Sequence, residues 1–360
     1  MNILDFGESD LLAEKTYLEL DDDTIKIKNN IPWIEKYRPN NFNDIISHNN
    51  ILIALEKMIN KKNFPHLMFY GPPGIGKTTT ILSCAKKMYG ENYKNMILEL
   101  NGSEDRGINV VREQIKEFSV SKQFISNLTS NVENRLKLVI LDEADSMTSD
   151  AQFALRRVIE NYTSNVRFCI ICNYDTKIIS ALKSRCMIFR FSPIPKKLHF
   201  DKIKKICEIE NVKITHDAIN IIVTLAEGDM RKSINLVQVM NTSFKFLDHI
   251  IDKNDVFKQL GYPTLEETNI IINIIFDKNI KLSKTINEIN KLKLQFGITT
   301  NDILKQLTEY LVSYANSTNV SNILLILDML GNIENYMSIS YNDALILGNI
   351  ISCIKCNIYE

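Results

Sequence analysis

The sequence has no excess of charge of either sign. It contains 43 lysine and arginine residues against 43 aspartate and glutamate residues. A balanced chain has no overall electric field that would draw it onto nucleic acid or an anionic membrane. Any contact with DNA must therefore come from a local patch.

Long apolar runs are absent, and so is a basic segment followed by an apolar core at the N-terminus. The first ten residues instead carry Asp5, Glu8 and Asp10. A membrane-spanning helix needs about 20 consecutive, mostly apolar residues, and a secretory signal needs that basic start. We therefore expect a soluble, intracellular protein that has no membrane partner.

The cysteines do not form a recognisable metal-binding or disulfide pattern. There are seven, an odd number, which is typical of reduced thiols in an intracellular protein. Cys169 and Cys172 lie in a strand-like run, where positions three apart point to opposite faces. Cys353 and Cys356 could share a helix face, but no second pair of ligands accompanies them. We predict no zinc site.

A chain of 360 residues is long enough for two or three domains. Residues 1–31 are acidic and polar with weak periodicity, and we expect them to form a mobile N-terminal extension. Five apolar runs then alternate with helical stretches, which predicts a parallel five-stranded α/β sheet with flanking helices. The expected strands are 66–70, 96–100, 138–141, 167–172 and 187–191.

A domain boundary is predicted at Ser192-Pro-Ile-Pro195, because two prolines in four residues disfavour both helix and strand. The α/β domain would then span residues 32–193. A small helical domain is expected over 194–250, with Gly228 as a helix stop. Residues 251–360 show helical periodicity and no chemical motif, so we expect an all-helical packing or assembly domain.

The segment Gly71-Pro-Pro-Gly-Ile-Gly-Lys-Thr78 matches the phosphate-loop pattern G-x-x-x-x-G-K-[ST]. It follows an apolar strand and precedes a helical run, as that pattern requires, whereas a chance glycine turn would lack these flanks. Backbone N–H groups would turn toward phosphates, Lys77 would reach the outer phosphates, and the Thr78 hydroxyl would coordinate Mg²⁺.

Two carboxylates, Asp142 and Glu143, end the apolar strand 138–141. This is the edge of a parallel sheet where binding crevices open. Asp142 could hold Mg²⁺ through water, and Glu143 could polarise the attacking water. The alternative is an acid that caps a helix. Asn173 ends the next strand and could hydrogen-bond the γ-phosphate or its water.

The run Asp142-Glu-Ala-Asp145 is also the signature of a large helicase family. The sequence lacks that family's Ser-Ala-Thr motif, its second α/β domain and its arginine motif. Two arginines, Arg185 in Ser184-Arg-Cys186 and Arg231 in Gly228-Asp-Met-Arg231, are instead candidates to stabilise charge on the phosphates. Taken alone, each could be an ordinary surface arginine.

With these motifs assembled, the sequence resembles the AAA+ ATPases, and within them the small subunits of replication factor C, the eukaryotic sliding-clamp loader. The resemblance runs from Trp33-Ile-Glu-Lys-Tyr-Arg-Pro39 to Gly228–Arg231. It includes Leu100–Ile108 and Asp150–Arg157, and covers about residues 32–245. It implies an AAA+ domain, a helical lid and an α-helical collar. One departure is Gly102, where the family usually has alanine, and we expect it to loosen the local backbone.

The resemblance also implies roles for individual residues. Asn173 would be the first sensor and Arg231 a second sensor supplied by the lid, while Arg185 would be an arginine finger that acts in trans on a neighbour's site. Ile34 and Arg38 would lie by the adenine and phosphates. The implied ATP-binding set is Ile34, Arg38, Gly71, Pro72, Pro73, Gly74, Ile75, Gly76, Lys77, Thr78, Thr79, Asn173 and Arg231.

Arg106 and Arg112 match family positions that follow the DNA backbone. Phosphate contacts of this kind would be sequence-tolerant and salt-sensitive. Their separation of six residues does not place both on one helix face, which favours a loop-plus-helix arrangement. Solvated arginines or intramolecular ion pairs are the alternative.

The function implied is that of an ATP-hydrolysing subunit of a nuclear heteropentamer. With ATP and Mg²⁺, it would open the clamp PCNA and load it onto primer-template DNA in replication and repair. One rival is a structural subunit of the same complex that hydrolyses ATP slowly. Another is a homo-oligomeric DNA motor such as a branch-migration ring.

Overall fold

The computed structural model describes residues 31–61, 63–103, 108–120, 136–244, 249–315, 320–337 and 342–358. The predicted N-terminal extension, apart from residue 31, lies outside this set. The chain divides into two compact units. The first holds the described residues up to Lys213 together with those from Ile219 to Phe244. The second holds Ile214–Ala218 and the described residues from His249 onward.

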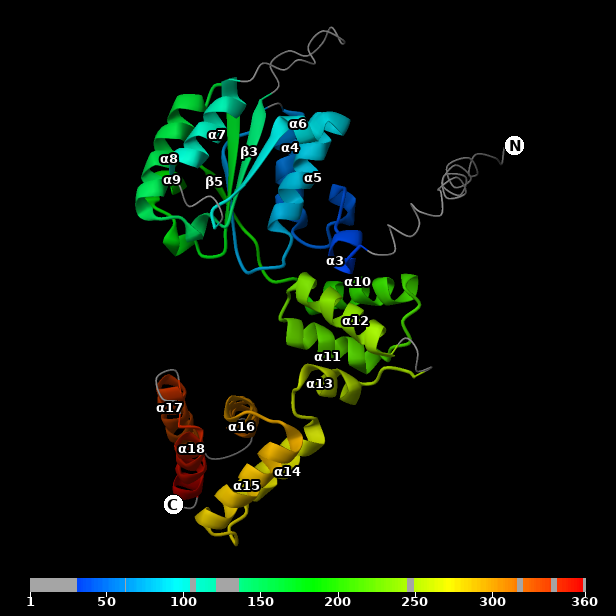
Figure 1. The fold of residues 1–360 in the computed structure, drawn as a ribbon, viewed down its shortest axis with the longest axis vertical. Helices are drawn as coiled ribbons and strands as arrows, with labels where there is room; N and C mark the ends of the chain where they lie inside the picture. The colour runs from blue at the N-terminus through cyan, green and yellow to red at the C-terminus, as the bar shows by residue number, and fades with distance from the viewer. Residues whose placement is uncertain are drawn as a thin grey trace, which may run out of the picture. The chain divides into compact units, whose positions relative to one another are not determined.

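The first unit contains a five-stranded parallel sheet in the order β2-β3-β4-β1-β5 (Figure 1). All five predicted strands are confirmed, with bounds shifted by one residue at most. The strands are β1 (Leu67–Tyr70), β2 (Ile97–Asn101), β3 (Lys137–Asp142), β4 (Val166–Cys172) and β5 (Met187–Arg190).

Helices cover both faces of the sheet, as the continuous apolar strands require. One core cluster joins Phe69 and Cys169 to residues of α4 and α5 such as Ile81, and the other joins Phe168 and Cys172 to residues of α7 and α8. The helices of this layered part are α3 (Trp33–Lys36), α4 (Asn49–Asn60), α5 (Lys77–Tyr89), α6 (Tyr93–Met96), α7 (Ile108–Val120), α8 (Ser149–Tyr162) and α9 (Ser180–Lys183), with short 3₁₀ turns at Phe42–Asp44, Gly90–Asn92, Ala144–Ser146 and Asp175–Lys177.

Cys169 and Cys172 belong to opposite core clusters. Side chains three apart in β4 therefore point to opposite faces of the sheet, as the alternation of a strand predicts. The chain continues into three further helices, α10 (Lys196–Ile209), α11 (His216–Ala226) and α12 (Met230–Phe244). We call α10–α12 the lid helices.

The second unit is helical, as its periodicity predicted. Its core consists of isoleucine and leucine side chains from α14 to α18, among them Ile275, Leu307 and Ile350. The elements are α13 (Lys253–Leu260), α14 (Leu265–Phe276), α15 (Leu282–Phe296), α16 (Thr300–Ala315), α17 (Val320–Met337) and α18 (Asp343–Ile358). Among the described helices, none is both long enough and apolar enough to cross a membrane.

Candidate nucleotide site

The glycine-rich loop connects β1 to α5 and adopts a backbone that side chains would obstruct. Gly71 has φ +145°, and a Cβ there would lie 2.2 Å from the carbonyl oxygen of Phe191. Gly74 has φ +67°, and a Cβ there would lie 1.7 Å from Oδ1 of Asp229. Position 71 therefore needs glycine for space as well as for conformation, whereas at Gly74 the left-handed backbone is the stronger reason, since the Asp229 side chain can turn aside.

Lys77 is the first residue of α5 and its side chain is buried. Its ammonium group donates to the carbonyl oxygens of Gly71 and Pro72, both at 2.7 Å, and to Oδ1 of Asn173 at 2.9 Å. Burial lowers the pKa of Lys77 to about 8, against the raising effect of Asp142. The cation is held by neutral oxygens at a helix N-terminus, a position suited to an anionic phosphate.

Thr78 and Asp142 meet where the loop faces the end of β3. The Thr78 hydroxyl donates to Oδ2 of Asp142 at 2.6 Å, and the backbone N–H of Glu143 donates to the other carboxylate oxygen at 2.9 Å. A hydroxyl oxygen beside a carboxylate is a hard-oxygen donor pair of the kind Mg²⁺ prefers, with water or phosphate completing its shell. The donor chemistry at this point therefore fits magnesium.

Glu143 has a left-handed backbone, with φ +52° and ψ +37°, and an exposed side chain. This conformation is uncommon for glutamate and is typical of constrained sites. Its carbonyl oxygen accepts from the N–H of Ser146. Gly102 lies against this turn. A Cβ at Gly102 would lie 2.7 Å from the carbonyl oxygen of Glu143, which is too close, so glycine here also prevents a steric clash. Gly102 thus leaves room for the Glu143 turn.

An open cleft extends from the glycine-rich loop to the lid helices. Arg38, which lines it, forms an ion pair with Glu35 at 3.1 Å. The N–H of Met230 donates to the carbonyl oxygen of Gly74 at 3.1 Å, which ties the start of α12 to the loop. The predicted binding residues that line this cleft are Ile34, Arg38, Gly74, Ile75, Gly76, Thr79 and Arg231.

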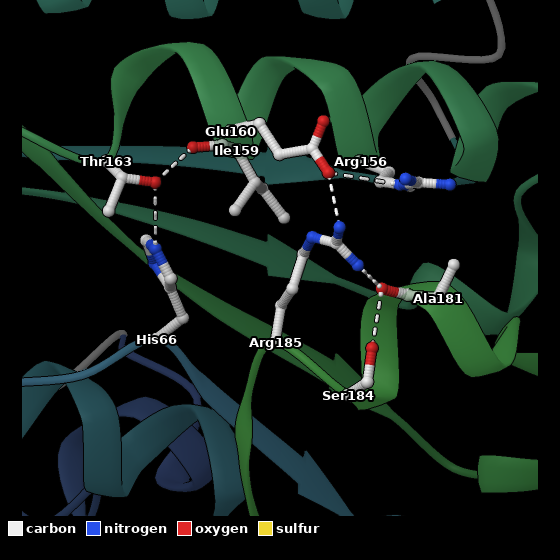
Figure 2. Close-up of polar contacts among 8 residues, drawn as sticks. All are labelled: His66, Arg156, Ile159, Glu160, Thr163, Ala181, Ser184 and Arg185. Atoms are coloured by element: carbon white, nitrogen blue, oxygen red, sulfur yellow. Dashed lines mark hydrogen bonds and ion pairs between the residues drawn. The ribbon is translucent and has the colours of Figure 1, made fainter.

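Arg185 lies apart from this cleft, just after α9 (Figure 2). Its guanidinium donates to the carbonyl oxygen of Ala181 at 2.7 Å and pairs with Glu160 on α8. Glu160 also accepts from Nε of Arg156 at 3.1 Å, and the two arginines lower the pKa of this carboxyl. The structure brings Lys77, Thr78, Asp142 and Asn173 together and leaves Arg185 on another part of the domain.

Of the two predicted DNA-binding residues, Arg112 belongs to α7 and Arg106 lies outside the described residues. The side chain of Arg112 lies outside them as well.

Figure 2 also shows His66, which lies at the base of β1 and contacts the end of α8. The N–H of Phe168 donates to Nδ1 of His66 at 3.2 Å, so Nδ1 is an acceptor and the ring proton belongs on Nε2, 3.4 Å from the Thr163 hydroxyl. Burial, with a smaller effect from Arg167, lowers the pKa of His66 to about 4.

The low pKa of His66 predicts acid sensitivity of the first unit. Between about pH 6.5 and pH 4 the unfolded chain binds a proton that the folded chain does not, so stability falls as the pH falls through this window. We expect His66 to contribute a loss on the order of 2 kcal/mol in unfolding free energy between pH 7 and pH 5. The measurement is urea unfolding at both pH values, followed by the fluorescence of Trp33, the single tryptophan.

His66→Gln removes this titration, so its unfolding free energy should depend less on pH than that of the wild type. If His66→Gln showed the same pH dependence as the wild type, the loss of stability at low pH would not come from His66.

The sequence assigned no role to three residues that make structural contacts in the first unit. Asp229 packs on Gly74, although the segment around it was notable only for Arg231. Gln152 on α8 donates to the carbonyl oxygen of Lys177 and accepts from the N–H of Ile179, which fixes the loop that leads to Arg185. Glu210, at the end of α10, accepts from Tyr37.

Comparison with known protein families gives two matches. Residues 67–194 match the model for the ATPase family associated with various cellular activities (AAA), and residues 201–242 match the RCF1/5-like AAA+ ATPase lid domain.

Curated relatives align over most of the chain. Probable replication factor C subunit 5 of Dictyostelium discoideum is 43% identical, with 96% of each chain covered. Replication factor C subunit 3 of Schizosaccharomyces pombe is 42% identical, with 91% of this chain and 92% of the relative covered. Replication factor C subunit 5 of Homo sapiens is 39% identical, with the same coverage. The segments Asn173-Tyr174, Lys177–Ile179 and Ala181-Leu182 predict a likeness to the subunit called five in animals, and the curated relatives include subunits named 5 and 3.

Among solved structures, the RuvB Holliday junction branch-migration motor of Thermotoga maritima matches with a TM-score of 0.50. It is 19% identical, and the match covers 73% of this chain and 86% of that one. At this identity the likeness concerns the fold alone.

Proposed function

Because this chain belongs to the replication factor C family of AAA+ ATPases, we propose that it is an ATP-hydrolysing subunit of a heteropentameric clamp loader. The complex would open the sliding clamp PCNA and place it on primer-template DNA. We further propose the divisions 32–193, 194–250 and 251–360 as the ATPase, lid and collar domains. The nucleus is the proposed location.

The observation that carries this proposal is the convergence of the buried Lys77 ammonium, Asn173 and the Thr78–Asp142 pair at one end of the glycine-rich loop. If this loop did not bind nucleotide, a lysine buried among neutral oxygens would only cost stability, because burial disfavours the charged form of the side chain. A phosphate placed there would supply the counter-charge. This arrangement supports an anion site, and the adjacent cleft is the proposed place for the rest of the nucleotide.

In the proposed reaction, Lys77 and the loop N–H groups hold the phosphates, and Arg38 and Arg231 approach them from the other walls of the cleft. Thr78 and Asp142 would hold Mg²⁺, which supplies charge neutralisation on the phosphate oxygens when bound. Glu143 orients and deprotonates the attacking water. Asn173, which accepts from Lys77, fixes the lysine relative to the end of β4.

Glu143→Gln is expected to slow ATP hydrolysis in the assembled complex by about 10²- to 10⁴-fold, because it removes the general base but keeps the shape of the side chain. ATP binding should be retained, since the loop and the lysine are unchanged. Single-turnover hydrolysis and equilibrium binding of labelled ATP measure the two quantities. Glu91→Gln, an exposed acid in the turn that follows α5, is the control. Equal rates in both variants would exclude Glu143 as the base.

The assembly itself tests the proposal against its rivals. Mixing the chain with candidate partner subunits and measuring the mass of the product should give a five-subunit complex with one copy of this chain. A self-assembled hexamer would instead favour the homo-oligomeric motor. A pentamer whose hydrolysis is insensitive to changes in this site would favour the slow structural subunit.

For DNA contact, we propose that Arg106 and Arg112 bind phosphates inside the complex. The motif match to the family supports this, and the salt dependence of DNA binding would test it.

A further inference from the structure

The segment Trp33–Pro39, here called the strap, is fastened to the lid helices at two points. The backbone N–H of Trp33 donates to Oε1 of Gln238 on α12 at 3.1 Å. Lys36 and Tyr37 both donate to Oε1 of Glu210, the lysine at 2.6 Å. Figure 1 shows α3, the helical part of the strap, beside α10 and α12. The strap and the lid are therefore held together directly.

Glu210 is the C-cap residue of α10, and only 16% of its side chain is exposed. Burial and this carboxylate together raise the pKa of the Tyr37 phenol, so Tyr37 stays protonated and donates. A hydrogen bond to a half-buried carboxylate is stronger than a neutral one. The Lys36 ion pair is more exposed, and pairs of that kind contribute little. Tyr37 is thus the main partner of Glu210.

The strap and the lid are also two walls of the cleft. Ile34, Tyr37 and Arg38 line it from the strap, and Ile194, Met230 and Ile234 line it from the lid side. The glycine-rich loop, which would take the phosphates, forms a third wall. The strap and lid residues are largely apolar, as expected for the part of a nucleotide site that encloses the base.

We propose that Glu210 is a positioning residue for nucleotide binding: through Tyr37 it holds the strap against the lid and so fixes the width of the base-binding part of the cleft. This inference rests on the proposed function, in which the cleft binds ATP. Glu210 is not among the residues that line the cleft, whereas its partner Tyr37 is, so it acts through the strap. No sequence motif contains it.

The test is calorimetric titration of the full-length chain with Mg-ATP, which gives both the Kd and the number of competent sites. Glu210→Ala should raise the Kd about tenfold, the value of one good hydrogen bond to a charged group. The site number should stay near that of the wild type. Tyr37→Phe should reproduce most of the effect. Glu210→Gln, which keeps an oxygen acceptor, should restore most of the affinity.

Glu208→Ala is the matched control, because Glu208 is an exposed acid on the same helix that pairs with Lys204. It should bind ATP as the wild type does. An unchanged Kd in Glu210→Ala would overturn the inference. So would a fall in the site number at constant Kd, which would mean that Glu210 only maintains the fold.

Lys77→Ala separates this inference from the proposed function. If that variant loses ATP binding while Glu210→Ala binds normally, only the positioning role of Glu210 fails. If Lys77→Ala binds ATP as tightly as the wild type, the proposed site itself is wrong, and the role of Glu210 fails with it.

Discussion

Replacing Lys77 with alanine is expected to reduce the clamp- and DNA-stimulated ATP hydrolysis at this site by about a hundredfold or more, and to weaken ATP binding strongly. The ammonium group is buried and lies 2.7 Å from two loop carbonyl oxygens. Removing it leaves those oxygens facing the phosphates with no positive charge between them. Steady-state hydrolysis by the reconstituted complex, with and without clamp and primed DNA, measures the loss.

The control for this substitution is Lys87→Ala, on the same helix. Lys87 is exposed and pairs with Glu56, so its loss should leave hydrolysis unchanged. Comparable hydrolysis in Lys77→Ala and the wild type would mean that the intact motifs do not turn over ATP here, and that the slow structural subunit is the correct description.

Arg185→Ala is expected to slow hydrolysis in the complex by about 10³-fold at one site, while this chain still binds its own nucleotide. Arg185 contacts Glu160 and Ala181 rather than its own glycine-rich loop, and about a third of its side chain is exposed. In the proposed role, it would instead reach the nucleotide site of a neighbouring subunit. Single-turnover hydrolysis in complexes that carry the change in this subunit alone, together with ATP binding by the separate chain, tests both halves.

Arg156→Ala is the matched variant for Arg185, because both arginines pair with Glu160. It removes one partner of the same carboxylate without removing the proposed finger, and hydrolysis should remain near the wild-type rate. If the two variants behave alike, the effect belongs to the ion-pair network on α8 rather than to a group that acts in trans.

The sheet and the phosphate loop could be predicted from the sequence because their signals are local. A continuous apolar strand such as Leu138–Leu141 and a glycine pattern at fixed spacing each carry their information within a few residues. The division of the helical part of the chain into residues 194–250 and 251–360 was based on a weaker periodicity, and these domain boundaries stay a prediction.

The contacts that close the cleft could not be predicted in this way. Asp229 meets Gly74, and Glu210 meets Tyr37, across more than 150 residues of sequence in each case. From the sequence alone, an aspartate before a helix, such as Asp229, is expected to cap that helix, and a glutamate after a helix, such as Glu210, is expected to be solvated. Only the packing of the lid helices against the ATPase domain gives either residue a second role.

The pairing of β1 with β5 has a mechanical consequence. The glycine-rich loop follows the carboxyl end of β1, whereas Arg185 precedes the amino end of the neighbouring β5. At that end, the N–H of Met187 donates to the carbonyl oxygen of His66. The glycine-rich loop and Arg185 are therefore separated by the length of a four-residue strand, about 13 Å. If Arg185 serves a neighbouring subunit as proposed, a displacement of the glycine-rich loop by nucleotide would pass along this short strand pair to Arg185, and occupancy of one site would affect hydrolysis at the next.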